Sequence, residues 1–246
     1  MHFARISLIF LGFTGILAAQ NGSQPVPQHA PDGGVRERLE SLNIPAEANA
    51  PFSATVTTEW TKILVDGSKQ TTWNHRLIAR DSSGRVFQER RFFMPDGDKA
   101  TTQLSETDYA DPNRHELFLC RPMQRVCYEY PYNQPEPLKT APVAIAHPHT
   151  DSVKSEDLGR RTISGVDTEG SREIITLPAG VNGLERSEPV VKEFWYSPRL
   201  GINVITKRFD PRSGAQNFTV GNINQSEPDP KLFVVPEGFR IVKMTP

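Results

Sequence analysis

The sequence lacks most of the motifs that would identify a chemistry. It contains no P-loop, no dinucleotide-binding glycine pattern, no zinc-finger spacing and no metalloprotease helix. It also lacks an excess of either charge, because 28 lysines and arginines stand against 29 aspartates and glutamates. A balanced charge gives no electrostatic reason to expect nucleic acid as a partner. We predict no catalytic residue, metal or cofactor, and a hydrolase stays open only because a catalytic triad is recognised by geometry.

Long apolar runs are also missing, with one exception near the first residue. Residues 6–17 form a mostly apolar run after Arg5, and small side chains follow at positions 18 and 19. This order is typical of a secretory signal, and the run is shorter than the roughly 20 residues that span a bilayer. We predict a signal peptide at residues 1–19 with cleavage between Ala19 and Gln20. The mature chain then has no transmembrane segment and is periplasmic or extracellular in a bacterium; an uncleaved anchor is the alternative.

Cysteine is scarce, since the chain has only two. An exported chain meets an oxidising compartment, so Cys120 and Cys127 are predicted to form a disulfide, with a redox or metal site as the alternative. A loop opened by Pro122 and closed by residues 121 and 126 gives a hairpin register that agrees with the apolar pattern. That register brings together on one face Leu117 with Tyr130 and Leu119 with Tyr128, and on the other face Phe118 with Glu129 and the two cysteines.

The remaining chain divides into three parts. Residues 20–34 are rich in Pro, Gln and Gly and are predicted to be disordered. Residues 35–246 are predicted to form a single β domain, in which residues 35–43 form a short helix before Pro45. A Pro-rich loop at residues 131–157 interrupts this domain, and its apolar stretch at 143–146 is expected to cover an apolar face.

From residue 52 the apolar period is two, which is typical of half-buried strands. Turn signals separate the strands, and no repeat and no long helical pattern is present. An antiparallel meander of about ten strands follows. The predicted strands are residues 52–64, 73–80, 86–94, 101–109, 114–121, 125–131, 158–169, 171–177, 189–196, 202–209 and 215–224.

Charged residues crowd one of these strands. Glu89, Arg90 and Arg91 follow one another, so charges lie on both of its faces. They could line a polar pocket or orient a substrate carboxylate. We favour cross-strand ion pairs on a solvated face, which contribute little to stability.

Aromatic residues offer a second candidate site. Phe194, Trp195 and Tyr196 are consecutive, so they alternate between the faces of a strand. Either both faces are covered, or one face lines a ligand cavity; ordinary core packing is the alternative. The candidate ligand-binding residues are Trp60, Trp73, Phe92, Phe194, Trp195 and Tyr196.

The second half of the chain carries a resemblance. It has Ile-Ser-Gly-Val at 163–166, Trp-Tyr-Ser-Pro at 195–198, Asp-Pro-Arg at 210–212 and Glu-Pro-Asp-Pro at 227–230. These segments resemble a group of uncharacterised secreted bacterial proteins. The strand order and the closing Leu-Phe-Val-Val-Pro at 232–236 are similar to the LolA/LolB-like superfamily of lipoprotein carriers. This resemblance implies a curved, incompletely closed antiparallel barrel with an apolar concave face under a lid.

Together these observations predict a mainly β protein with one curved antiparallel sheet, a half-barrel or incomplete barrel of about ten strands with one or two short helices. The predicted function is non-enzymatic binding of a lipid, a lipidated partner or another apolar ligand. A structural or interaction module of the cell envelope without a pocket is the alternative. The turn at 229–233 is expected to bury Phe233, so Phe233→Ala should cost about 3–5 kcal/mol if the ring is buried.

Overall fold

The computed structural model describes residues 32–35, 38–95, 103–132, 153–180 and 184–244. Strands dominate these residues, and their helical elements are two short 3₁₀ turns. In chain order the elements are β1 (Asp32–Val35), β2 (Arg38–Leu42), β3 (Phe52–Ile63), β4 (Lys69–Arg80), β5 (Val86–Arg91), β6 (Leu104–Asp111), β7 (Glu116–Arg121), η1 (Pro122–Gln124), β8 (Val126–Pro131), β9 (Val153–Ile163), β10 (Val166–Leu177), β11 (Glu188–Ser197), β12 (Ile202–Asp210), β13 (Gly214–Asn224), η3 (Pro230–Phe233) and β14 (Arg240–Lys243).

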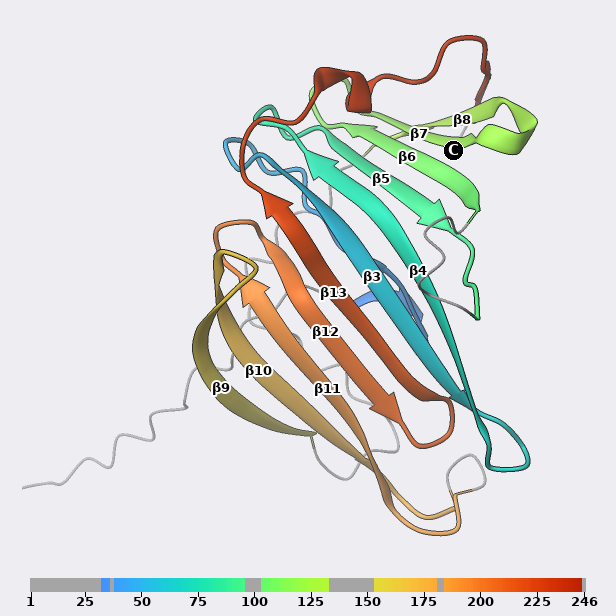
Figure 1. Cartoon of the computed structure of the whole chain (residues 1–246), viewed down its shortest axis with the longest axis vertical. Helices are drawn as coiled ribbons and strands as arrows, with labels where there is room; N and C mark the ends of the chain where they lie inside the picture. Colours follow the sequence, from blue (N-terminus) through green and yellow to red (C-terminus); the bar gives the residue numbers. More distant parts are fainter. Residues whose placement is uncertain (1–31, 36–37, 96–102, 133–152, 181–183, 245–246) are drawn as a thin grey trace, which may run out of the picture.

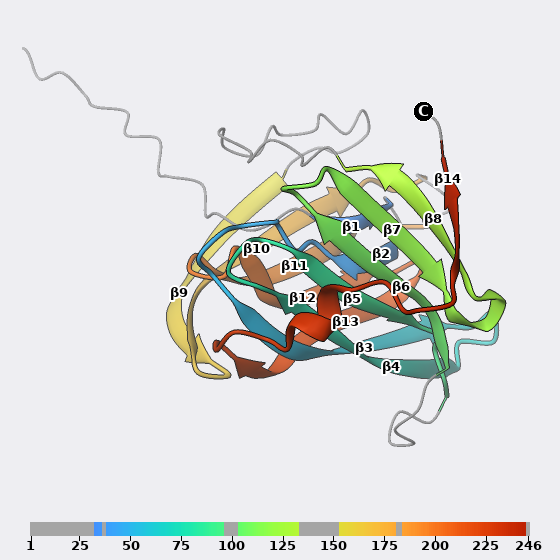
Figure 2. The ribbon, with the colours of Figure 1, turned by 90° about the horizontal axis from the view of Figure 1, so that it is seen from above.

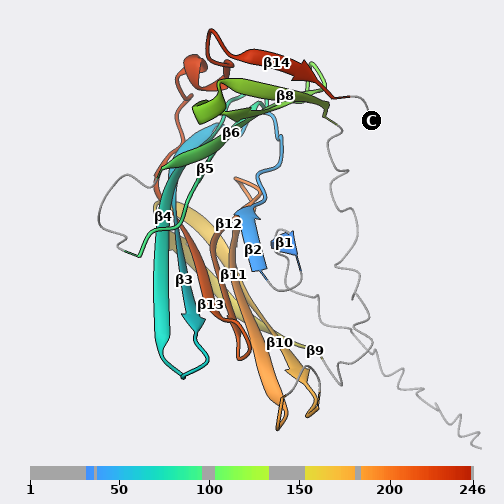
Figure 3. The same ribbon diagram turned by 90° about the vertical axis from the view of Figure 1, so that its right-hand side faces the viewer.

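One sheet holds twelve of the described strands in the order β14-β8-β7-β6-β5-β4-β3-β13-β12-β11-β10-β9. Neighbouring strands of this sheet are antiparallel, except that β14 runs parallel to β8. The sheet curves strongly without closing (Figure 1). Its edges are β9 and β14, both of which are labelled in Figure 2. The predicted fold class, a single curved and unclosed antiparallel sheet, is therefore confirmed. A separate hairpin, β1-β2, lies on the concave side (Figure 2; Figure 3).

The N-terminal helix predicted at residues 35–43 is wrong. This stretch contributes to the β1-β2 hairpin, in which Val35 pairs with Arg38 and Gly33 pairs with Ser41. Pairing with β1 supplies backbone hydrogen bonds that a helix would have made internally. Residues 32–34, the last of the segment predicted to be disordered, belong to β1. The predicted signal peptide at residues 1–19 and the apolar stretch at 143–146 lie outside the described residues.

The strand boundaries between residues 153 and 177 also differ from the prediction. The expected strand at 158–169 is interrupted by a turn, because Ser164 and Gly165 adopt left-handed backbone angles with φ of 50° and 79°. A two-residue turn of this kind joins twisted antiparallel strands. This turn separates β9 from β10, and β10 runs unbroken to Leu177. At its other end β9 begins at Val153, inside the loop predicted at 131–157.

Aspartates begin several of the hairpin turns. The Asp81 carboxylate accepts hydrogen bonds from the backbone N–H of Ser83 and Arg85 at 3.0 and 2.9 Å. The backbone N–H of Arg212 donates to Asp210 Oδ1 at 3.0 Å in the same way. An aspartate that accepts from the backbone two residues later mimics a turn, which explains why the Asp-containing turn signals locate these hairpins.

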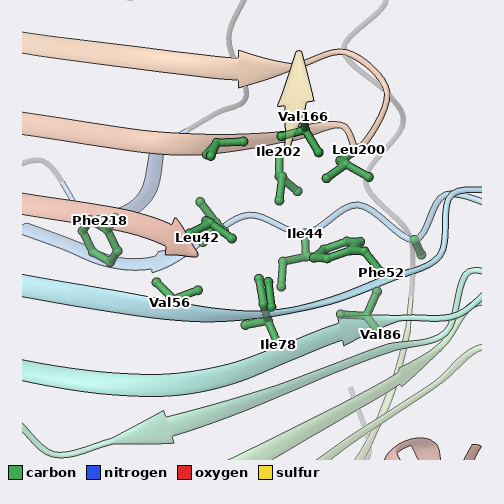
Figure 4. Packing of buried hydrophobic residues seen from close by; sticks show 14 residues of the cluster. Leu42, Ile44, Phe52, Val56, Ile78, Val86, Val166, Leu200, Ile202 and Phe218 are labelled. Carbon is green, nitrogen blue, oxygen red and sulfur yellow. The ribbon is translucent and has the colours of Figure 1, made fainter. Parts of the chain in front are cut away.

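The two faces of the sheet are covered by different parts of the chain. We call the face that carries Phe52 and Val56 the inner face, because it is the concave one that packs against Leu42 and Ile44 (Figure 4). Burial of these side chains contributes about 1.5–3 kcal/mol each. The buried members of this cluster are Leu42, Ile44, Ala46, Phe52, Ala54, Val56, Ile78, Val86, Val166, Leu200, Ile202, Val204, Phe218 and Val220.

A buried arginine fastens the covering segment to the inner face. The Arg80 side chain is fully buried and donates to the carbonyl oxygens of Ala50, Pro45 and Leu200 at 2.8–2.9 Å. Its Nε and Nη2 both donate to Ala50. Arg80 therefore joins the chain before β3 to the loop before β12.

The opposite, outer face is covered by the C-terminal segment that contains η3. Here the Cys120–Cys127 disulfide, which the sequence predicts, packs with Phe87 and Tyr109. The predicted hairpin register is confirmed, since Leu117 pairs with Tyr130 and Cys120 with Cys127. Phe233 contacts this cluster but is only half-buried, so the condition for its full stabilising effect is not met.

Candidate functional site

A groove of about 340 Å³ opens on the inner face at the β5-β7 end of the sheet. It is lined by Arg90, Phe92, Ser105, Glu106, Arg121, Met123 and Gln124. Strand alternation places Arg90 on the inner face, two residues beyond Gln88, which pairs with Ile78 of the inner core. The groove combines charge with exposed apolar surface, because Phe92 is 52% and Met123 71% exposed.

The charges of the groove belong to a larger cluster. Arg90 Nε lies 3.0 Å from Asp108 Oδ2, and Arg121 Nε lies 3.9 Å from Glu106 Oε2. Burial raises the pKa of Asp108 even though Arg90 and Arg76 act against it. Burial, with repulsion from Asp108, also raises the pKa of Glu106. Burial, with repulsion from Arg90, lowers the pKa of Arg76 to about 10.

Four buried polar atoms lie in or next to this cluster without a hydrogen-bond partner in the described part of the chain. They are Thr58 Oγ1, Asn74 Oδ1, Arg76 Nη2 and Asp108 Oδ1. Thr58 pairs directly with Asn74 across β3 and β4, and Arg76 follows on the same face of β4. A buried polar atom without a partner costs about 1–3 kcal/mol. A group of unpaired buried polar atoms is unusual in a protein core, so the part of the inner face that holds these four residues is a candidate functional site.

Besides Phe92, three of the six aromatic candidates lie on the inner face. Phe194 is fully buried opposite Thr206. The Trp60 ring packs edge-on against Phe93 at a centroid distance of 6.1 Å, and Lys62 Nζ lies 4.0 Å from its centroid. Tyr196 is half-buried, and burial raises the pKa of its hydroxyl, with a further contribution from Glu47. None of these three residues lines the groove.

Two other candidates lie on the outer face. The Trp195 indole donates to Glu193 Oε1 at 3.0 Å and stacks under Arg161, whose guanidinium is 3.6 Å from the ring centroid. The ring also covers Gly170, where an added Cβ would lie 2.7 Å from it. Trp73 pairs with Met94 through two backbone hydrogen bonds of 2.8 Å. The structure therefore divides the six aromatic candidates between two faces, and Phe92 alone lines the inner groove.

A second groove of about 460 Å³ lies over β10-β13, mainly on the outer face. Its apolar floor includes Phe209, which is 45% exposed. One side of it is a row of paired charges, in which Glu193 accepts from Arg172 at 3.0 Å and from Lys207 at 3.4 Å. Because these charges are paired with one another, this groove offers mainly apolar surface.

The polar residues of the inner face were missed in the sequence because they alternate with apolar ones. On β4, the period of two predicts that Leu77 and Ala79 lie on the buried side and that Asn74 and Arg76 lie in water. Both sides are covered here, and Asn74 and Arg76 are 5% and 4% exposed. The available signal was that β3 and β4, which pair, carry their apolar residues on opposite faces.

Glu89, Arg90 and Arg91 all form ion pairs, but the pairs differ from the predicted cross-strand pairs on a solvated face: Glu89 and Arg91 pair within β5, and the cross-strand partner of Arg90, Asp108, is buried. Arg91 donates to Glu89 in a fork of two hydrogen bonds, each 2.9 Å long. Arg90 pairs across the strands with Asp108 and also lines the inner groove. The alternative role in a polar pocket therefore stays open for Arg90.

Two kinds of feature are absent from the described residues. No cluster of three or more His, Cys, Asp or Glu side chains suited to a metal ion occurs among them. The described residues also contain no helix of sufficient length and apolar character to cross a membrane.

Comparison with known proteins gives only distant structural likenesses. No family model matches the chain, and no curated protein matches it. A chain of the Pseudomonas aeruginosa MucA/MucB complex superposes with a TM-score of 0.41 and 11% identity over 81% of this chain and 60% of that chain. An uncharacterised conserved protein from Thermus thermophilus gives 0.36 and 10% over 80% and 91%. A LolA superfamily protein from Nitrosomonas europaea gives 0.31 and 10% over 76% and 91%. At these values the likeness implies nothing about ligand or partner.

Proposed function

We propose that this chain is an exported, non-enzymatic binding protein of the bacterial cell envelope that holds an apolar or lipidated ligand against the concave face of its sheet. The observation that carries the proposal is the inner groove of about 340 Å³, in which Phe92 and Met123 stay exposed beside arginines. Sites for small ligands are concave and combine apolar surface with a few polar groups.

Export is supported by two features of the chain. The apolar run at residues 6–17 with small residues at 18 and 19 has the order of a secretory signal. The Cys120–Cys127 disulfide is of the kind that persists in oxidising compartments and is rare in the cytosol. Cleavage between Ala19 and Gln20 remains part of the proposal.

The position of the site follows from which part of the inner face is already covered. The apolar part carrying Phe52, Ile78 and Ile202 packs against Leu42 and Ile44 of the same chain. A ligand could not use that surface unless residues 42–46 moved away. We therefore assign the ligand to the β5-β7 end of the inner face, where the groove lies.

A structural or interaction module of the envelope is the second candidate. The outer groove favours it, because Phe209 is exposed next to Val191 and Ile174, which also line this groove. Exposed apolar surface of this kind occurs at protein interfaces. The two candidates use opposite faces of the sheet, so one pair of variants separates them.

Native mass spectrometry and lipid extraction of the protein purified from its own envelope test the proposal. We expect a bound lipid or acylated molecule on the wild type and its loss from Phe92→Ser. The matched control is Phe209→Ser, which removes a ring of similar exposure from the outer face and should retain the molecule. An empty wild type, or loss from Phe209→Ser alone, would contradict the proposal.

A further inference from the structure

Three arginines, Arg76, Arg90 and Arg121, lie at the β4-β7 end of the inner face, and some of their N–H groups have no acceptor among the described residues. Arg90 uses Nε for Asp108, and its two Nη atoms bond to no residue that the structure describes. Arg121 Nε is 3.9 Å from Glu106, too far for a hydrogen bond, and its guanidinium lies 5.2 Å from the centroid of the Tyr128 ring. Guanidinium groups with free donors are the usual partners of phosphate and carboxylate groups.

Arg76 adds a buried donor to the same cluster. It lies two residues from Ile78 on β4, as Arg90 lies two residues from Gln88 on the paired strand β5. Arg76 Nη1 donates to Gln88 Oε1 at 3.4 Å, while Nη2 is buried without a partner in the described residues. A cation this buried normally has a full set of acceptors. The unused hydrogen-bond donor at Nη2 therefore points to an acceptor that the described residues do not supply.

The charge balance of the cluster favours an anion. Among the described residues, the carboxyl groups that act on Arg76, Arg90 and Arg121 are those of Glu106, Asp108 and Glu89. Glu89 is itself paired with Arg91, so four guanidinium groups stand against three carboxyl groups. Burial raises the pKa of the Glu106 and Asp108 carboxyl groups, so protonation of either one would increase the positive excess. A bound anion would offset the repulsion between Arg76 and Arg90.

We propose that this cluster binds the acidic head group, a phosphate or a carboxylate, of an amphiphilic ligand whose apolar tail lies along Phe92 and Met123. Arg90 and Arg121 bind the head group in the groove, and Arg76 lies behind them as a buried positive charge. The inference rests on the proposed function and narrows its ligand class from apolar molecules to anionic amphiphiles. The groove accounts for both parts, since charged and exposed apolar side chains line the same 340 Å³.

Isothermal titration with three probes tests this assignment on the full mature chain. The probes are dodecyl phosphate and dodecyl maltoside, both below their micelle concentrations, and inorganic phosphate. We expect dodecyl phosphate to bind at least about tenfold more tightly than dodecyl maltoside, because the uncharged maltose head group cannot form charge-assisted hydrogen bonds with the guanidinium groups. Inorganic phosphate should bind more weakly than dodecyl phosphate, since it lacks the tail.

Two variants and a control locate the head group. Arg90→Gln and Arg121→Gln should each lose most of the preference for phosphate while keeping the affinity for dodecyl maltoside. Arg121 is 49% exposed, so its replacement leaves the fold intact even if Arg90→Gln proves unstable. Arg114→Gln is the matched control, because Arg114 lies in the β6-β7 turn, is 70% exposed and pairs with Glu116 away from the groove.

The failures of the two proposals give different results. Equal affinity for both amphiphiles, weakened by Phe92→Ser but not by the arginine variants, overturns the head-group inference and leaves the proposed function standing. Binding of neither amphiphile overturns both. Inorganic phosphate binding as tightly as dodecyl phosphate overturns the amphiphile assignment, because the tail then contributes nothing.

Discussion

The two ends of the inner face differ in what covers them. At one end Phe52, Ile78 and Ile202 pack against residues 42–46, and the chain itself buries its apolar surface. At the other end arginines and carboxylates face a groove with exposed Phe92. The apolar end therefore serves stability, and the charged end is the part of the concavity that is available to a ligand.

Two buried arginines on β4 show the same difference at the level of single residues. Arg80 donates four hydrogen bonds to three carbonyl oxygens. Arg76 lies four residues earlier on the same face of β4. It has one long hydrogen bond and a buried Nη2 without a partner among the described residues. A buried arginine with all its acceptors in place is structural, whereas one that lacks acceptors is a candidate for binding.

The largest expected effect comes from exchanging these two arginines for methionine. Arg80→Met leaves three carbonyl groups without their donor and should lower the free energy of unfolding by at least about 3 kcal/mol. Arg76→Met removes a poorly paired buried charge and should be neutral or stabilising, as replacements of buried ions often are. Urea unfolding measures both values. Equal destabilisation by the two variants would remove the distinction between them.

The outer face provides the next test, because its core is closed by a disulfide. Replacing both Cys120 and Cys127 by serine should lower the free energy of unfolding by about 2.5 kcal/mol, from the entropy of an eight-residue closed loop. Urea unfolding in the presence of a reductant is the control, since it should abolish the difference between the wild type and the variant. A loss below about 1 kcal/mol would mean that β7-β8 is held by packing alone.

Phe233 tests how much the C-terminal cover contributes. The ring is half-buried against the outer core, and Arg85 lies 5.1 Å from its centroid. Phe233→Ala should therefore cost about 1–2 kcal/mol, less than the 3–5 kcal/mol of a fully buried ring. Thermal unfolding measures it. The comparison is Phe52→Ala, because the Phe52 ring is fully buried on the inner face. An equal loss of unfolding free energy in the two variants would contradict the smaller contribution expected of the C-terminal segment.

The smallest effect is a change in pH dependence at the charged end. Burial raises the pKa of Asp108 above 3.8, so the folded protein binds this proton more tightly than the unfolded chain. Asp108 therefore stabilises the fold at low pH and loses that contribution as the pH rises through its raised pKa. Above pH 4, the free energy of unfolding of Asp108→Asn should therefore fall less steeply with pH than that of the wild type. The two slopes should differ by up to about 1.4 kcal/mol per pH unit.

Asp210 is the matched control for this pH dependence. Burial acts to raise its pKa, but hydrogen bonds from Arg212 outweigh that effect and lower it. Asp210 therefore stabilises the fold above its ordinary pKa, and this contribution is lost as the pH falls through its lowered pKa. Asp210→Asn should lower stability at pH 7 and leave it unchanged at low pH. Parallel pH profiles for the two variants would contradict both assignments.

Local patterns in the sequence were sufficient for most of the fold. The period of two, the Asp-containing turns and the Cys120–Cys127 spacing predicted the sheet and the β7-β8 register. The turn at Ser164 and Gly165 was missed because apolar residues flank it on both sides. Residues 35–43 were misassigned because their apolar spacing fits a helix, whereas the β1-β2 pairing is a tertiary preference that spacing does not encode.

The candidate site was much less accessible to sequence reasoning. Aromatic residues were singled out for their area, yet Trp195 covers Gly170 on the outer face and Phe194 lies in the core. Arg76 and Asp108 are 32 residues apart in sequence, and the pairing of both β4 and β6 with β5 brings them together. Alternation predicts which side chains share a face, but not which face the rest of the chain covers.

Photo-crosslinking with a dodecyl phosphate that carries a diazirine at the end of its tail tests the central claim most directly. Mass spectrometry of the digested protein locates the label on the chain. We predict labelling of residues 86–94 and 116–125, around Phe92 and Met123 of the inner groove, with competition by unlabelled dodecyl phosphate. Labelling concentrated on residues 202–217, around Phe209 of the outer groove, would contradict the account.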